Sequence, residues 1–431
     1  MIKRLINIVL LLFLTLTQIT CNTNRGRNSE DLIYWSSNNS QEIEFARYEV
    51  NQWNKNNPRM HVSFQPVPEG QSSEEIILAA VVGKTTPDIY SNMWEGDVES
   101  YAEAGVLVPL DTLKGFMDFL YSRCDSSVVN EVRSKDGHIY QIPWKTNPIM
   151  VIYNKNEFKD AGVTELPQNY SDFFNDANKF SKDTNGDGYI DRWIGYVEPI
   201  SLWWQRFFDF YPLYLAASGG GSLVKNNRAA FNNKYAVEVF SFLQSLYNHN
   251  YFSRQRLSQQ QDVFLSGIIA TRFTGPWEIR HSEKYKPKGF SYGFFPMPVP
   301  DDHKGPVYTY GDPKNIVIFN TCKNPQAAWD FIKIMIDEKG DLKFLEVCDQ
   351  LPRRKDLETN PVFENYFKQN PKMKIFAAQE KYAKGTDSSP VLKQVFDLIS
   401  QQYEACVIYG KKTPQQAIKD AADAVNLLFM K

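Results

Sequence analysis

The chain has few of the residues on which metal and nucleophilic chemistry depend. Its 431 residues include only 5 cysteines and 5 histidines, and these do not recur at the spacing of a zinc site. No Gly-x-Ser-x-Gly sequence is present to place a nucleophilic serine on a sharp turn. Zinc enzymes and serine hydrolases are therefore disfavoured. A glycosidase stays open, because that chemistry needs only a suitable pair of carboxylates.

The chain also lacks an excess of either charge and, beyond its first residues, a long apolar run. It carries 48 basic and 50 acidic residues, for a net charge of −2. A nucleic-acid-binding protein would show a basic excess, so we expect no nucleic-acid partner. No later apolar run approaches the ~20 residues of a membrane-spanning helix. The length is too great for one compact core and predicts two lobes.

The first residues have the layout of a secretory signal. Lys3 and Arg4 precede an apolar run from Leu5 to Leu16, which at about 12 residues is too short to span a bilayer. Cys21 follows, and it resembles the lipidated first residue of a mature bacterial lipoprotein. Residues 22–30 are hydrophilic and are typical of a flexible tether. We expect export and a lipid anchor at Cys21; the alternative is an ordinary cleaved signal with a chance cysteine.

Four cysteines remain beyond Cys21: Cys124, Cys322, Cys348 and Cys406. Outside the cytoplasm they could form disulfides, but a sequence does not give their connectivity. Buried free thiols are an equally good interpretation.

The order of predicted elements indicates an α/β fold. Strands are expected at 31–35, 62–67 and 88–90, with helices at 41–54 and 73–82 between them. This alternation is typical of a parallel sheet. The same pattern recurs later, with helical spacing prominent after residue 389. The proline-rich stretch Pro296 to Pro300 interrupts it, and we expect a crossing between lobes there. In the last predicted helix, Thr413 is the expected N-cap before Pro414.

Residues 183–191 resemble an EF-hand calcium loop. Oxygen side chains alternate, a glycine stands at the sixth position and an apolar residue at the eighth. Ile194 occupies the position of the usual bidentate glutamate, so a ligand is missing there. The alternative is a turn without metal. The expected ligands of a structural Ca²⁺ are Asp183, Asn185, Asp187, the Tyr189 carbonyl and Asp191.

Aromatic residues make up 14% of the chain, and several tryptophans fall at predicted strand ends or in loops. In parallel α/β sheets such positions face a ligand cleft. A flat ring beside hydrogen-bonding side chains suits a sugar, whose C–H face stacks while its hydroxyls are bound. Each of these tryptophans could instead belong to the core. The tryptophans so placed are Trp35, Trp94, Trp144, Trp204 and Trp277.

Short motifs along nearly the whole mature chain resemble the extracellular solute-binding proteins of ABC importers, in the large sugar-binding family that includes maltose-binding protein. Their order and spacing carry the resemblance, since each motif alone is weak. The matching segments are Thr86 to Ile89, Ala102 to Asp111, Ile142 to Trp144, Ile152 to Phe158, Ala161 to Val163, Gly219 to Gly221, Phe273 to Trp277, Pro296 to Pro298, Asn324 to Phe331 and Gln350 to Arg354.

The resemblance implies a type II periplasmic-binding-protein fold, in which two lobes, each a mainly parallel sheet flanked by helices, are joined by several crossings. Residues 31–143 and 301–347 would form lobe 1, and residues 144–300 and 348–431 lobe 2. Crossings would lie near Pro143, near Pro296 to Pro300 and near Cys348 to Arg353. The ligand-binding residues expected on this basis are Trp35, Trp94, Glu95, Trp144, Trp204, Trp277, Tyr310, Asp312 and Arg353.

The implied function is capture of a carbohydrate between the lobes and its delivery to the transmembrane subunits of an ABC permease, without catalysis or a catalytic cofactor. The protein would be an extracytoplasmic monomer, attached to the lipid bilayer through Cys21. Two alternatives stay open: a secreted glycoside hydrolase, and a ligand sensor for a membrane receptor. Family members also bind other solutes, such as glycerol phosphates or polyamines.

Replacing Cys21 tests the anchor. We expect Cys21→Ser to shift the exported protein from the membrane fraction to the soluble fraction, because the acylated thiol is lost. Cell fractionation followed by immunoblotting measures this, with Cys124→Ser as the matched control that should stay on the membrane. Unchanged membrane association of Cys21→Ser would show that the anchor was misassigned.

Overall fold

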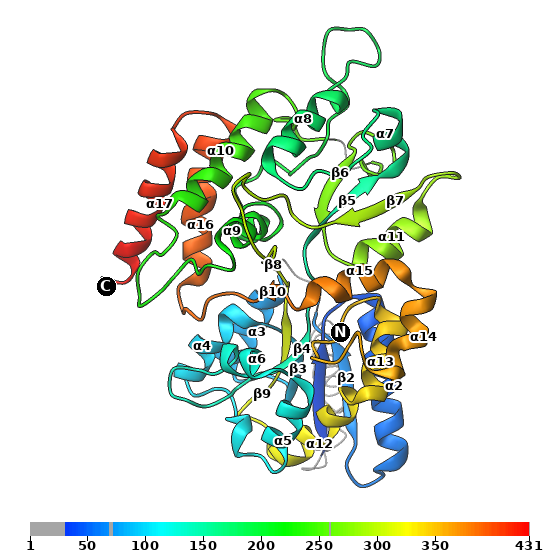
Figure 1. The fold of residues 1–431 in the computed structure, drawn as a ribbon. Coiled ribbons are helices and arrows are strands. Elements are labelled where there is room, and N and C mark those ends of the chain that lie inside the picture. Colours follow the sequence, from blue (N-terminus) through cyan, green and yellow to red (C-terminus); the bar gives the residue numbers. More distant parts are fainter. Residues whose placement is uncertain (1–30, 69–71, 258–259, 431) are drawn as a thin grey trace, which may run out of the picture.

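The computed structural model describes residues 31–68, 72–257 and 260–430. The predicted signal, Cys21 and the tether lie outside the described residues. Figure 1 shows two lobes, one above the other, each built around its own sheet. The predicted two-lobed α/β fold is confirmed.

The first lobe is built on a five-stranded sheet of order β2-β1-β3-β9-β4. Its strands β1 and β2 are parallel, as are β1 and β3, whereas β9 runs antiparallel to both β3 and β4. The strands are β1 (Leu32–Ser36), β2 (Val62–Pro66), β3 (Ile89–Trp94), β4 (Ile142–Lys145) and β9 (Lys314–Ile318). The helices of this lobe are α2 (Ser40–Asn56), α3 (Ser73–Gly83), α4 (Glu95–Glu103), η1 (Leu110–Thr112), α5 (Phe116–Arg123), α6 (Ser126–Glu131), α12 (Pro325–Met335) and α13 (Glu338–Cys348).

The second lobe has a three-stranded sheet of order β6-β5-β7, and both of its strand pairs are antiparallel. The expectation of a mainly parallel sheet is therefore wrong for this lobe. Its strands are β5 (Met150–Asn154), β6 (Thr271–Thr274) and β7 (Tyr292–Phe295). Its helices are α7 (Lys155–Asp160), α8 (Tyr170–Phe180), η2 (Trp203–Phe208), α9 (Phe210–Ser218), α10 (Lys234–Asn248), α11 (Trp277–Tyr285), α16 (Leu392–Tyr403), η3 (Glu404–Ile408) and α17 (Pro414–Leu428).

Local sequence explains several element boundaries. Thr413 caps α17 by accepting the backbone N–H of Gln416 at 3.2 Å, and Pro414 follows as the first helical residue, as predicted. Asn39 caps α2 in the same way, accepting the N–H groups of Gln41 and Glu42. Because these caps satisfy donors that the first helical turn leaves open, each helix begins at a defined residue.

The remaining elements join the lobes. Strands β8 (Thr309–Tyr310) and β10 (Ala383–Lys384) form a small parallel pair between the two sheets, and α14 (Pro361–Gln369) and α15 (Pro371–Glu380) precede β10. Residues of α14 and α15 share a hydrophobic cluster with one face of the second sheet. Within the described residues, no helix is both long and apolar enough to cross a membrane. The four described cysteines are buried, and no disulfide joins any two of them.

The proline-rich stretch differs from its predicted role as a crossing, and the first crossing begins slightly later than the predicted lobe boundary. Strand β4 continues to Lys145 within the first sheet, so the first crossing begins after the predicted boundary at residue 143. The proline-rich stretch does not cross, because Val299 pairs with Asn169 and Asp301 accepts the backbone N–H of Ser171, which hold it beside α8. The chain crosses later, around β8.

Backbone hydrogen bonds tie the crossing segments together into one hinge. The N–H of Thr146 donates to Leu351 at 2.9 Å, and that of Ile149 to Tyr310 at 2.8 Å. The N–H of Gly311 donates to Lys384, also at 2.8 Å. Four segments distant in sequence therefore share hydrogen bonds where the lobes join.

A buried ion pair lies at this hinge. Lys145, at the end of β4, pairs with Glu42 of α2, and each side chain is only 4% exposed. Glu42 also accepts hydrogen bonds from Ser37 at 2.8 Å and from Gln350 at 2.9 Å. Burial alone would raise the pKa of Glu42, but the Lys145 ammonium and these hydrogen bonds hold it below its ordinary value.

Removing the lysine tests the importance of this pair. We expect Lys145→Met to lower the free energy of unfolding by about 3–5 kcal/mol, because Glu42 stays buried without its cation. Since the native pKa of Glu42 is lowered, its contribution is present above its ordinary pKa and is lost as pH falls below it. Urea denaturation at several pH values measures both effects, and the variant should lose that acid dependence.

Two further variants provide the controls. Lys419→Met breaks an exposed ion pair with Asp423 and should cost less than about 1 kcal/mol. Adding Glu42→Gln to Lys145→Met should restore much of the lost stability. Equal losses from Lys145→Met and Lys419→Met would contradict the importance of the buried pair.

Candidate functional site

The two lobes meet in an aromatic contact. Trp94, the last residue of β3, is 2% exposed, and its ring lies 5.2 Å from that of Trp203 and 5.8 Å from that of Phe207, both in η2 of the second lobe. Phe207 stacks in turn on Tyr310 of β8, at 4.7 Å and 19°. A Cβ at position 96 would lie 2.3 Å from the Trp94 ring, so Gly96 lets the indole lie across the start of α4.

A row of carboxylates on α4 faces the chain that follows β10. Ser388 donates to Glu99 at 3.0 Å, and the Lys393 ammonium lies 3.0 Å from Asp97. Lys393 is also 5.5 Å from the ring centre of Trp94, close enough for a cation–π interaction. The second lobe is therefore held against α4 by both charge and aromatic surface.

Glu95, the first of these carboxylates along α4, is also buried. It is 7% exposed and accepts the backbone N–H of Thr386 at 3.2 Å. Burial and the neighbouring Glu131 raise the pKa of Glu95 to about 8. A Cβ at position 385 would lie 2.0 Å from the Glu95 carboxylate, so this approach requires Gly385.

Arg353 anchors the adjoining polar region. The residue is 5% exposed, and its guanidinium pairs with Glu131 at 2.9 Å; Glu131 also accepts the N–H of Gly385 at 2.8 Å. Nε of Arg353 has no hydrogen-bond partner. A cavity of about 130 Å³ adjoins it, lined in part by Glu131 and Glu380, and burial raises the pKa of Glu380 to about 7. This region offers both donors and acceptors of hydrogen bonds.

Asp312 lies on the crossing that follows β8. It accepts a hydrogen bond of 3.4 Å from the Tyr310 hydroxyl, and it lies 3.9 Å from the Lys314 ammonium. Burial raises its pKa. Its backbone has φ of 39°, in the left-handed region that Asp tolerates better than most residues. Asp312 therefore belongs to the polar side of the same junction.

The structure brings together four of the nine predicted ligand-binding residues closely, and places Asp312 beside them. Those four are Trp94, Glu95, Tyr310 and Arg353. Trp35 is half-buried against a small cluster of the first lobe that includes Met93, and Trp277 is half-buried with its ring 6.2 Å from that of Phe208. The ring partner found for Trp277 is thus Phe208, next to Phe207, rather than Trp94 itself.

Two predicted tryptophans lie elsewhere. Trp144 is 1% exposed and packs on Phe344 in the core of the first lobe, because alternation along β4 directs its neighbour Lys145 to the hinge instead. Trp204 is 40% exposed, while the adjacent Trp203 makes the interlobe contact. Successive residues of a 3₁₀-helix point about 120° apart, so only one of the pair can face Trp94.

Sequence reasoning missed Trp203, Phe207, Lys393 and Glu131. The adjacent pair Trp203-Trp204 was a usable signal, but it did not say which ring faces the other lobe. Lys393 and Glu131 carry no local motif, and their roles follow only from the packing of lobe against lobe.

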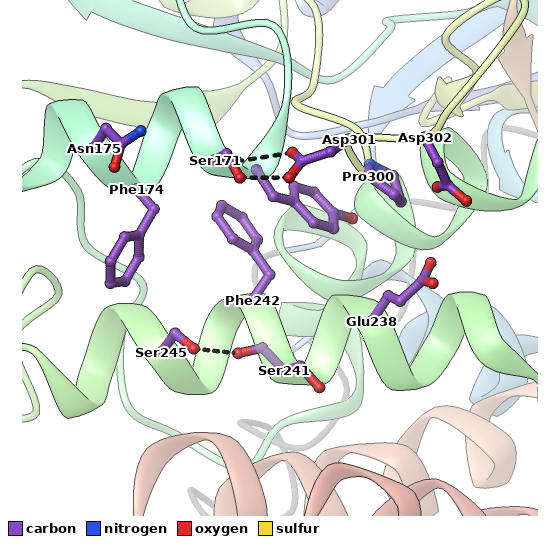
Figure 2. Close-up of a pocket in the computed structure, with 11 residues that line it drawn as sticks. Ser171, Phe174, Asn175, Glu238, Ser241, Phe242, Ser245, Pro300, Asp301 and Asp302 are labelled. Atoms are coloured by element: carbon purple, nitrogen blue, oxygen red, sulfur yellow. Dashed lines mark hydrogen bonds between the residues drawn. The ribbon is translucent and has the colours of Figure 1, made fainter.

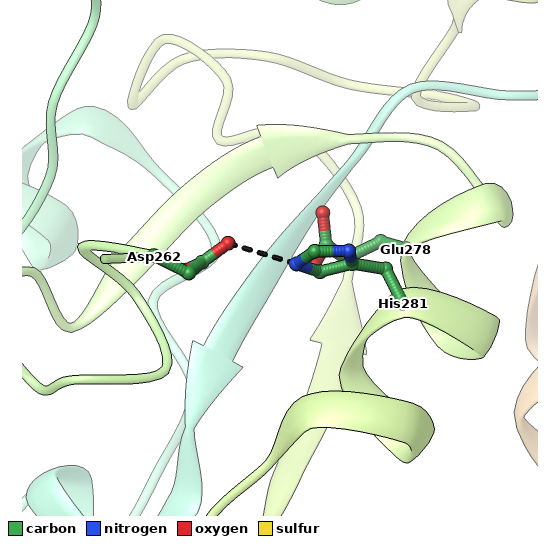
Figure 3. A group of neighbouring side chains, drawn as sticks. All are labelled: Asp262, Glu278 and His281. Carbon is green, nitrogen blue, oxygen red and sulfur yellow. Dashed lines mark hydrogen bonds and ion pairs between the residues drawn. The ribbon is translucent and has the colours of Figure 1, made fainter. Parts of the chain in front are cut away.

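Figure 3 shows the group of three metal-type side chains found among the described residues: Asp262, Glu278 and His281. His281 lies 3.1 Å from Asp262. Arg272, however, pairs with Asp262 at 2.5 Å and with Glu278 at 3.4 Å. A guanidinium thus already neutralises these carboxylates, and the group is better described as an ion-pair network than as a metal site.

Known proteins resemble this chain in both sequence and fold. The sequence profile of the family described as "Bacterial extracellular solute-binding protein" matches residues 38–341. The diacetylchitobiose binding protein DasA of Streptomyces coelicolor is 25% identical over 297 residues, 67% of this chain and 65% of that protein, just under two thirds of its length. The maltotriose-binding protein of Pyrococcus abyssi is 23% identical over 350 residues, 78% of this chain and 71% of that protein.

Among solved structures, an uncharacterized protein from Listeria monocytogenes EGD-e aligns with a TM-score of 0.79 and 26% identity, covering 93% of this chain and all of that one.

The predicted calcium loop winds around its own oxygen side chains. Each accepts backbone N–H groups from within the loop: Asp183 from Gly186 and Gly188, Asn185 from Asp187, and Asp187 from Tyr189, all at 2.7–2.9 Å. The bond from Gly188 is the main reason why the pKa of Asp183 lies below its ordinary value. These oxygen donors fit Ca²⁺. The position of the usual bidentate glutamate supplies no ligand, because it holds Ile194, whose aliphatic side chain is buried in the hydrophobic core. The ligand set, which also includes Asp191, stays a prediction.

Calcium dependence of the melting temperature tests that ligand set. We expect CaCl₂ to raise the Tm of the unmodified protein by several degrees relative to EDTA, because the ion binds only the folded loop. Asp187→Ala should abolish the difference, whereas Asp423→Ala, on the exposed face of α17, should keep it. Equal Tm values in CaCl₂ and EDTA for the unmodified protein would eliminate the calcium site.

Proposed function

Because the chain belongs to the family of bacterial extracellular solute-binding proteins, we propose that it binds a carbohydrate between its two lobes. The observation that carries the proposal is the contact of Trp94 with Trp203 and Phe207 beside the buried Glu95. Rings that stack on sugar C–H faces lie next to groups that bind hydroxyls. One relative is named as a diacetylchitobiose binding protein and another as a maltotriose-binding protein, and both names support the same ligand class.

In this arrangement the aromatic rings are in direct contact, so the lobes must part before a sugar enters. Opening about the hinge would separate Trp94 from Trp203 and expose both rings. A ligand that touches both lobes then favours renewed closure, because only the closed form makes both sets of contacts. Binding and closure need no chemical step.

Glu95 and Glu131 raise the question of a glycosidase, since a carboxyl with a pKa of about 8 could serve as a general acid. Glu131 is held by Arg353 and by the N–H of Gly385. Both glutamates therefore have structural partners across the junction. We propose that they bind hydroxyl groups and hold the lobes together.

We further propose that the protein delivers its ligand to an ABC permease while attached to the membrane through Cys21. Residues 22–30 would serve as the flexible tether between the lipid anchor and the binding lobes. Tethering confines the receptor near its permease and so raises its effective concentration there. This arrangement gives a purpose to a lipid anchor on a binding protein.

The adjacent pair Trp203 and Trp204 allows a matched test of the sugar site. We expect Trp203→Ala to weaken sugar binding at least about tenfold, because the half-buried ring that packs on Trp94 at the interlobe contact is lost. Trp204→Ala removes a ring that is 40% exposed and should change affinity by less than about twofold. Isothermal titration calorimetry against maltotriose, diacetylchitobiose and mannotriose measures both, with a reducing-sugar assay alongside.

Three outcomes would contradict the proposal. Equal effects of the two variants would place the sugar elsewhere. Release of reducing sugar by the purified protein would indicate a glycoside hydrolase. Binding of sn-glycerol 3-phosphate without binding of any of the three sugars would overturn the ligand class.

A further inference from the structure

A second groove lies within the second lobe, between α8 and α10. It has a volume of about 520 Å³, and Figure 2 shows its residues on the two helices and on the chain at 300–302. None of these residues makes the interlobe contacts described above. The lining residues are Tyr170, Ser171, Phe174, Asn175, Glu238, Ser241, Phe242, Ser245, Pro300, Asp301 and Asp302.

The groove has aromatic surface from both helices. Tyr170 and Phe242 stack at 4.1 Å with their planes 5° apart. Phe174 is half-buried and makes edge-to-face contacts with His249 at 4.9 Å and Tyr251 at 5.1 Å. In Figure 2, Phe174 and Phe242 extend from opposite helices into the space between them. These rings supply a flat apolar surface to an occupant.

Most polar groups of the groove are already satisfied. Asp301 accepts the N–H and the hydroxyl of Ser171, and Asp302 lies 3.4 Å from the Lys234 ammonium. Ser241 and Ser245 donate to backbone carbonyls of α10 at 2.8 Å. Their hydroxyl protons are therefore used within the protein.

Two buried atoms in the groove have no hydrogen-bond partner: Oη of Tyr170 and Oε2 of Glu238. Burial and the nearby Glu238 charge both raise the pKa of Tyr170, which places the two groups in one electrostatic environment. A buried polar atom without a partner costs about 1–3 kcal/mol. An occupant that pairs with both atoms would recover that free energy.

The two unpaired atoms discriminate among ligand classes. Ionised Glu238 repels an anion. An ammonium group donates hydrogen bonds but accepts none, so it would leave the Tyr170 proton unpaired. A hydroxyl can donate to Glu238 and accept from Tyr170. A sugar ring adds to this hydroxyl a C–H face that matches Phe174.

We propose that this groove is a second binding site, for a pyranose unit of a neutral sugar. One ring hydroxyl pairs with Glu238 and Tyr170, while the apolar face of the sugar packs on Phe174. The site does not depend on the interlobe function, because it shares no contact residue with it. All of its lining residues belong to the second lobe, so the proposed site does not require contact between the lobes.

Backbone amide shifts in a heteronuclear NMR titration test the site, with D-glucose, D-mannose and N-acetylglucosamine each taken to tens of millimolar. We expect at least one sugar to shift the amides of residues 170–175 and 238–245 saturably. Phe174→Ala should weaken this binding about tenfold. Trp203→Ala, which impairs the interlobe site, should leave it unchanged, so the two proposals fail separately.

Tyr170→Phe separates a binding role from a structural one. It keeps the ring stacked on Phe242 and removes only the unpaired hydroxyl, so the sugar-free protein should be as stable as before or more stable. Its affinity for sugar in the groove should nevertheless fall several-fold. Tyr285→Phe, at an exposed site in the same lobe, is the matched control and should change neither.

Two results would overturn the proposal. The first is the absence of saturable shifts at the groove with all three sugars, which would mean that only water pairs with Tyr170 and Glu238. The second is unchanged groove affinity in both Phe174→Ala and Tyr170→Phe.

Discussion

The buried pair of Glu42 and Lys145 constrains how the two lobes can move. Lys145 ends β4, an edge strand of the first sheet, and Gln350, which also bonds Glu42, lies on another crossing. Two charges out of water are costly unless each keeps its partner. The hinge can therefore bend at its backbone, but the crossing segments cannot slide past one another without leaving a charge unpaired. A pair of leucines here would give packing without this positional restraint.

Bending at that hinge would separate the two lobes where their aromatic and charged surfaces meet. The contacts of Trp94 with Trp203 and of Lys393 with Asp97 join surfaces that belong to different lobes. Both break together when the lobes part, because neither lies on the hinge. A ligand bound at the proposed site would have to replace them with contacts of its own, and it would gain most by offering an apolar face to the rings and hydroxyls to the carboxylates. In the proposed interlobe site, the side chains that hold the lobes together without ligand would also select the ligand that replaces those contacts.

Features of the fold that depend on residues close together in the sequence could be predicted, whereas features that depend on distant residues could not. The cap at Thr413 and the first three parallel strands depend on nearby residues, and these were correctly predicted. The hinge and the interlobe contacts depend on residues far apart in sequence. Trp144 and Lys145 illustrate the limit: both lie at a strand end, but the pleat sends one into the core and the other to the hinge. Trp203 and Trp204 show the same limit in a 3₁₀-helix: they are adjacent in the sequence, but one ring makes the interlobe contact and the other is exposed.

The raised pKa of Glu95 couples this junction to protons. Burial against the second lobe is the main reason why its pKa is about 8, with Glu131 adding to the shift while Arg353 opposes it. When the lobes part, Glu95 regains water and its pKa returns toward the ordinary 4.5. The contacting form therefore binds a proton more tightly, so contact is favoured as pH falls from 8 toward 4.5 and disfavoured as pH rises through that window. A sugar hydroxyl that donates to ionised Glu95 would act in the proton's place. The ligand hydroxyl and the proton would then compete for the Glu95 carboxylate, although each of them favours closure of the lobes. The ligand would favour closure most, relative to the ligand-free contact, at pH values where Glu95 is otherwise ionised.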